Sequence, residues 1–175
     1  MRHPAVVVVT SLLVLFSAAP RAAAADADQA TKTYLLNAAM CDLFAIETGR
    51  LAQERSQTPA LREMARQLTE DYVQAAVKRA ELIGKLQLDA VMPKTLDKER
   101  RHQVEELRQV EDGRFDREYL SMQIEAHETP LSLHRAYVNA GPDEPVRAVA
   151  ANAAATVERQ LAALRKVRDL PPRGA

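Results

Sequence analysis

Apolar side chains recur with helical spacing through four long segments of this chain, and this repetition limits the fold more than any other feature. The segments run from about 28 to 55, 59 to 88, 114 to 140 and 144 to 169. Side chains spaced by three or four residues lie on one face of a helix. We therefore expect an all-α fold in which four amphipathic helices bury their apolar faces against one another.

Residues that start and end helices separate these segments. Thr58 and Asp143 each stand where an N-cap is expected, just before a proline in the first helical turn. Gly113 breaks the pattern ahead of the third long segment. The stretch 95–110 is charged on most faces and is expected to form a shorter helix outside the bundle. These lengths fit an up-down four-helix bundle, or a variant in which this connection crosses from one end to the other.

The first 25 residues have the composition of a secretory signal peptide. Arg2 and His3 precede an apolar run from 5 to 19, and the alanines at 23–25 offer the small residues that a signal peptidase recognises. The apolar run is shorter than the roughly 20 residues of a membrane helix. We therefore expect residues 1–25 to be removed on export, with an uncleaved membrane anchor as the alternative.

The remaining chain is expected to be one helical-bundle domain, residues 26–170, followed by a flexible tail, residues 171–175. No segment after the signal sequence is apolar enough to span a membrane. Loss of residues 1–25 leaves 22 basic and 24 acidic side chains, which gives no basic surface for nucleic acid. The single cysteine, Cys41, cannot form an intrachain disulfide, so the core has to stabilise the fold.

Each long segment also places a polar side chain among apolar neighbours. These inward positions are Glu47 in the first segment, Asp71 with Tyr72 in the second, Gln123 with His127 in the third, and Gln160 in the fourth. Burial of such groups costs free energy unless they are paired, so we expect them to share one polar site. His134 lies two turns beyond His127, roughly 10 Å along the axis, and is the weaker candidate.

Two interpretations of this polar site stay open. Carboxylates and imidazoles bind iron, zinc or copper, which predicts a metal site formed by Glu47, Asp71 and His127, with Tyr72, Gln123 and Gln160 beside it. The same groups can instead form a hydrogen-bonded structural network without a metal. No His-Glu-x-x-His or Cys-x-x-Cys-His motif occurs, and the sequence predicts no catalytic residue.

Three stretches carry a resemblance to a known family. They are CDLFAIETGRLAQERSQTPALREMARQLTEDY at 41–72, FDREYLSMQIEAHETPLSLHRAY at 115–137, and VERQL at 157–161. Over about residues 34–167 the chain resembles the exported bacterial ferritin-like proteins grouped as domain of unknown function 4142. The resemblance implies a ferritin-like up-down four-helix bundle with an extra short crossover helix, placed in the periplasm or cell envelope.

The chain departs from that family at two of the inward positions. Family members usually have histidine where this chain has Tyr72 and Gln160, and the loss of two imidazoles should lower the affinity for a transition metal. We therefore favour a non-enzymatic binding or stress-protective role in the envelope, with an envelope protein as partner. The alternative is a metal-binding or redox protein that uses Glu47, Asp71 and His127.

Overall fold

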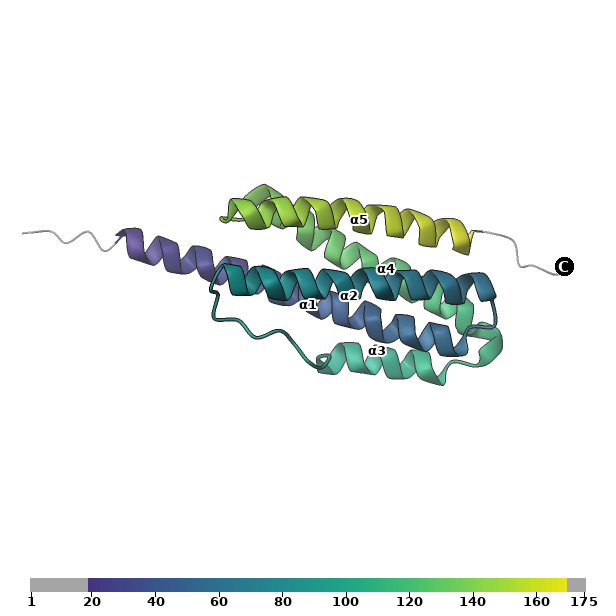
Figure 1. The fold of residues 1–175 in the computed structure, drawn as a ribbon. Helices are drawn as coiled ribbons and strands as arrows, with labels where there is room; N and C mark the ends of the chain where they lie inside the picture. Colours follow the sequence, from purple (N-terminus) through teal and green to yellow (C-terminus); the bar gives the residue numbers. More distant parts are fainter. Residues whose placement is uncertain (1–18, 170–175) are drawn as a thin grey trace, which may run out of the picture.

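The computed structural model describes residues 19–169, which form five α-helices and no strand (Figure 1). The helices are α1 Ala19–Arg55, α2 Pro59–Lys85, α3 Lys98–Gln109, α4 Asp112–Ala140 and α5 Glu144–Arg168. The prediction of an all-α fold with four long helices and one short helix is confirmed for these residues. None of the described helices has a stretch long and apolar enough to cross a bilayer. Most of the predicted signal sequence, residues 1–18, and the tail from 170 onward lie outside the described residues.

Two helical hairpins make up the bundle. α1 packs on α2, α4 packs on α5, and the hairpins meet mainly through α1 and α4. Two hydrogen bonds show that α1 and α4 run in opposite directions. Tyr34, early in α1, bonds to His134, late in α4, whereas Thr48, later in α1, bonds to Gln123, earlier in α4. The connection 86–111, which contains α3, carries the chain back along the bundle, so that α2 and α4 run the same way (Figure 1).

Two apolar clusters form most of the core. One surrounds Leu51, Phe115 and Tyr119, and the other surrounds Leu35 and Tyr137 near the opposite end of α1. Several polar side chains are buried along the stretch between them, including Asp42 and Thr48 in α1 and Gln123 and His127 in α4. Buried polar side chains are therefore present midway along the long helices.

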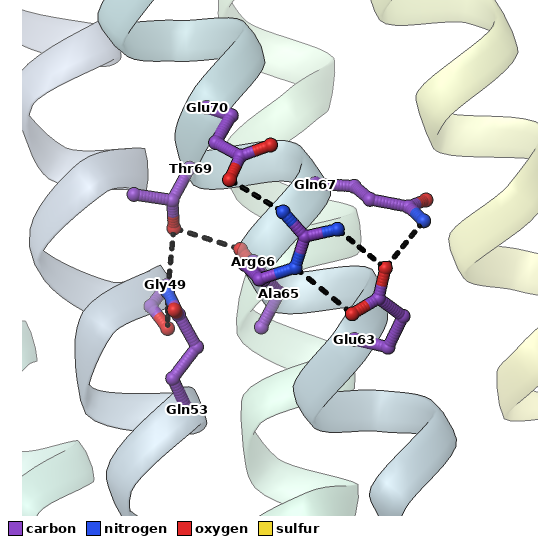
Figure 2. A network of polar contacts seen from close by, with 8 residues as sticks. All are labelled: Gly49, Gln53, Glu63, Ala65, Arg66, Gln67, Thr69 and Glu70. Atoms are coloured by element: carbon purple, nitrogen blue, oxygen red, sulfur yellow. Dashed lines mark hydrogen bonds and ion pairs between the residues drawn. The ribbon is translucent and has the colours of Figure 1, made fainter.

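A glycine brings α1 and α2 into close contact (Figure 2). A Cβ atom at Gly49 would lie only 2.3 Å from Oγ1 of Thr69. The Gln53 amide donates to Thr69 Oγ1 and to the Gly49 carbonyl, both at 3.1 Å, while Thr69 donates to the carbonyl of Ala65 at 2.7 Å. The absent side chain thus lets two helix backbones approach closely enough to share a polar contact.

Arg55, at the end of α1, holds the junction between α3 and α4. Its guanidinium donates to the carbonyl of Val110 at 2.6 Å and forms an ion pair with Asp112 at the same distance. It also lies 4.8 Å from the centre of the Phe115 ring, a cation–π distance. Because the last carbonyls of a helix lack intrahelical donors, Arg55 fixes where α3 ends and α4 begins.

Three local predictions need correction. α1 is already helical at Ala19, the first described residue, rather than from near 28, and it runs through the alanines of the predicted cleavage site, since alanine favours helix strongly. Gly113 does not separate two helices, because α4 starts at Asp112 and contains Gly113 in its first turn. Glycine is tolerated there because the N–H groups of a first turn have no partner within the helix. Thr58 occupies the N-cap of α2, but its hydroxyl donates to Asp116 at 2.6 Å and makes no cap bond.

Candidate functional site

His127 in α4 is almost fully buried, with 1% of its surface exposed. Its Nδ1 lies 2.7 Å from the carbonyl oxygen of Gln123, one turn earlier in α4. A carbonyl only accepts, so Nδ1 carries the hydrogen and Nε2 is left as an acceptor. Nε2 is buried and has no hydrogen-bond partner among the described residues.

Burial also sets the charge of this imidazole. Desolvation lowers the pKa of His127 to about 4, because a cation is disfavoured away from water. The ring is therefore neutral at pH 7, and its Nε2 lone pair is available. A neutral, unpaired nitrogen in the interior is unusual, since buried polar atoms normally find a partner.

His127 lines a cavity of about 550 Å³ among α1, α3 and α4. Cys41 and Tyr72 also face this space, and the Tyr72 ring meets the His127 ring edge to face at 5.7 Å between centroids. The walls include the apolar side chains of Phe44 and Met122. The cavity therefore has an apolar wall beside the polar groups of His127, Tyr72 and Cys41.

Charged side chains from α3 and α4 also line this cavity. They are four glutamates and one arginine: Glu99, Glu106, Glu118, Glu125 and Arg100. Arg100 is engaged by Asp97, and Glu118 by two arginines of its own helix. Glu99 and Glu125 have no ion pair among the described side chains. The charge on this side of the cavity is therefore predominantly negative.

Gln123 has a structural role beside this cavity. Its side-chain nitrogen donates to Oγ1 of Thr48 at 2.7 Å, and Thr48 donates to the carbonyl of Phe44 at 2.8 Å. Both side chains are almost fully buried. The contact joins α4 to α1 and satisfies these groups within the protein, so Gln123 is not free to hold a ligand through that nitrogen.

Asp71 and Gln160 meet elsewhere, across the gap between α2 and α5. The Gln160 amide donates to Oδ2 of Asp71 at 3.1 Å, while its own carbonyl oxygen is buried without a partner among the described residues. Both line a second cavity of about 490 Å³, together with His134. Tyr72 faces both cavities and lies between the two groups of polar residues.

The structure does not bring Glu47, Asp71 and His127 together. Asp71 is exposed because Tyr72, one residue and about 100° further round the helix, takes the inward position. Glu47 is half-buried and lines neither cavity, since the adjacent Thr48 occupies the inward position. Within residues 19–169 no three histidine, cysteine or acidic side chains are grouped so as to hold a metal ion. The predicted metal-binding role of these residues stays a prediction.

Asp42 and Arg79 form an ion pair that the sequence pattern did not predict, and both line the second cavity. Arg79 donates to Oδ2 of Asp42 through Nη2 at 2.8 Å and through Nε at 3.1 Å, and each side chain is only 5% exposed. Nearby, His134 Nδ1 lies 2.9 Å from the hydroxyl of Tyr34. Asp42 lies four residues from both Ala38 and Ile46, and Arg79 lies four residues from both Ala75 and Ile83. This apolar spacing was the sequence feature from which the inward position of both charges could have been predicted.

Comparison with known proteins supports the resemblance seen in the sequence. Residues 16–167 match a family described as a domain of unknown function, DUF4142. No curated protein and no solved structure matches the chain. The match spans nearly all of the described helices, including both cavities, so this chain is a member of the DUF4142 family.

Proposed function

We propose that this protein is a non-enzymatic binding protein of the cell envelope that takes a small ligand into the cavity among α1, α3 and α4. The observation that carries the proposal is the unpaired Nε2 of His127. The His127 side chain is 1% exposed and lines a cavity of small-molecule size, and its neutral Nε2 has no hydrogen-bond partner among the described residues, so the ring can accept from a hydrogen-bond donor of a ligand.

The other side chains of this cavity favour binding over catalysis. Burial raises the pKa of the Cys41 thiol, which keeps it protonated and weakly nucleophilic. Burial likewise raises the pKa of the Tyr72 phenol far above neutrality. Neither group is prepared to give up its proton near pH 7, as a nucleophile or a general acid must.

Export and the ferritin-like arrangement belong to the same proposal. Residues 24–30 of α1 are mostly exposed and project past the other helices (Figure 1). Among residues 24–169, whose burial the structure describes, the first buried side chain is Thr31, so cleavage after residue 25 would keep every one of these buried side chains. One long crossover between two helical hairpins is also the connectivity of ferritin-like bundles. Cell fractionation with N-terminal sequencing tests export: an intact Met1 would contradict cleavage.

Purification from the periplasm tests the binding role. The wild-type protein is compared with His127→Phe, which keeps a ring of similar size but lacks the acceptor, and small molecules released on denaturation are identified by mass spectrometry. His134→Phe is the matched control, because His134 is also buried, at 3% exposed, but lines the second cavity. We expect a compound that accompanies the wild type and the control but not His127→Phe. Identical profiles for all three would contradict the proposal.

A transition metal remains the second candidate, because a neutral histidine nitrogen is also a good ligand for iron, zinc or copper. Of the predicted set, only His127 faces this cavity, so a bound ion would need Cys41 or the glutamates as further ligands. Elemental analysis after loading with each metal tests this. Stoichiometric metal that His127→Phe abolishes would favour it, and its absence would leave these residues as a polar network.

A further inference from the structure

We infer that the ligand of the cavity among α1, α3 and α4 is an organic ammonium ion, a protonated amine on a short apolar body. The inference rests on the proposed function of this cavity and names the chemical class of its occupant. Three independent properties of the lining residues agree: the hydrogen-bonding demand of His127, the charge of the surrounding side chains, and the apolar walls.

The first property opposes a carboxylate or phosphate oxygen at Nε2. Nε2 of His127 can only accept, because the single ring hydrogen of the neutral imidazole is used at Nδ1 in the bond to Gln123. A carboxylate or phosphate oxygen placed there would face a lone pair in a buried setting, which is repulsive. An N–H group satisfies Nε2 and offers further hydrogens to other acceptors.

The second property favours a positive charge. Four glutamates line the cavity against one arginine, and that arginine is paired with Asp97. Glu99 and Glu125 have no ion pair among the described residues, so their charge is not locally neutralised. Carboxylates around a cavity with low-dielectric walls concentrate a negative potential and attract cations.

The third property separates an organic cation from a bare metal ion. Phe44, Met122 and Ala126 give the cavity an apolar wall, and Tyr72 adds an aromatic ring beside His127. Carbon chains lose contact with water on such a surface, and aromatic rings also attract ammonium groups. Within the described residues no three side chains are grouped to coordinate a metal, whereas an ammonium needs only acceptors and charge.

Three probes of equal length test the inference: hexylammonium chloride, 1-hexanol and sodium hexanoate. Cys41 is the only cysteine of the chain and lines the cavity, so an occupant should slow its labelling by methyl methanethiosulfonate. Saturation-transfer NMR with the same probes does not depend on thiol reactivity. We expect hexylammonium to bind at least about tenfold more tightly than hexanol, and hexanoate not to bind.

Charge variants locate the effect. Glu99→Gln and Glu125→Gln should each weaken hexylammonium binding roughly two- to fivefold, as expected for an exposed charge, and leave hexanol binding unchanged. Glu105→Gln is the matched control, because Glu105 lies in α3 outside the cavity. His127→Phe should remove most hexylammonium binding.

The outcomes distinguish this inference from the proposed function. Equal binding of all three probes, or a response to Glu105→Gln as large as that to Glu99→Gln, would overturn the ammonium assignment and leave a binding cavity. Failure of hexylammonium to bind would also overturn it, while a compound that accompanies the purified wild type and requires His127 would still support the binding role.

Discussion

Replacement of Arg79 by methionine should destabilise the protein by about 3–5 kcal/mol, because it leaves the carboxylate of Asp42 buried without its counter-ion. The structure gives the reason for the size of the effect. Arg79 makes two charge-assisted hydrogen bonds to one oxygen of Asp42, and both side chains are 5% exposed.

A double variant separates the cost of an unpaired charge from the value of the pair. Arg79→Met combined with Asp42→Leu removes both charges, and such replacements are often neutral or stabilising by 1–4 kcal/mol. We therefore expect the double variant to recover most of the stability lost in either single variant. Arg135→Met is the control, because its ion pair with Glu158 is as short, 2.7 Å, but exposed, and it should cost less than about 1 kcal/mol.

Urea denaturation followed by circular dichroism at 222 nm measures these differences. Burial already raises the pKa of Asp42, and Arg79 is the main influence that lowers it. In Arg79→Met that pKa should rise further, so the folded protein holds a proton that the unfolded chain has lost. The variant should therefore be less destabilised at pH 4.5 than at pH 7. A single-variant cost below about 1 kcal/mol, or a double variant no better than the singles, would refute the reasoning.

The remaining predictions concern glycines and histidines. Gly49→Ala should lower the free energy of unfolding by roughly 1–3 kcal/mol, because its Cβ would lie 2.3 Å from Oγ1 of Thr69. Gly84→Ala, which has no atom within 4 Å of the new Cβ, should raise it by about 0.5–1 kcal/mol. Urea midpoints that shift in the same direction in both variants would contradict this. Burial lowers the pKa of both His127 and His134 to about 4, while the unfolded chain takes up its protons near pH 6.5. Stability should therefore fall as the pH drops from 6.5 to 4, by up to about 3 kcal/mol per histidine, and His127→Phe should lose about half of that dependence. An unchanged pH profile in the variant would contradict the burial of this ring.

The helical class of the fold and most helix positions were predictable because their causes are local. Apolar spacing and proline placement identified α2 and α5 to within a few residues. Asp143 accepts a hydrogen bond from the backbone of Val146 at 2.8 Å, as an N-cap should. Thr58 shows the limit of such rules, because its hydroxyl donates to Asp116 in α4 and makes no cap bond to its own helix.

The polar site was predictable only in part. His127, Gln123 and Gln160 are buried as the pattern predicted. Asp71 is exposed instead. Apolar spacing locates the centre of the buried face of a helix only to within about one residue, and one residue corresponds to a rotation of 100° about the helix axis. The choice between two adjacent candidates, such as Asp71 and Tyr72, depends on how α2 is rotated against its neighbours.

By itself, the sequence determined an all-helical chain with inward polar residues, since helix periodicity and propensity act between residues within a turn or two of each other. Its motifs also indicated the family to which the chain belongs. Only the tertiary structure decided which polar groups meet. Asp42 and Arg79 are 37 residues apart, and their contact depends on the register of α1 against α2. The cavity around His127 likewise exists because α3 and α4 are held beside α1 by contacts between residues remote in sequence, and its unpaired nitrogen follows from that packing.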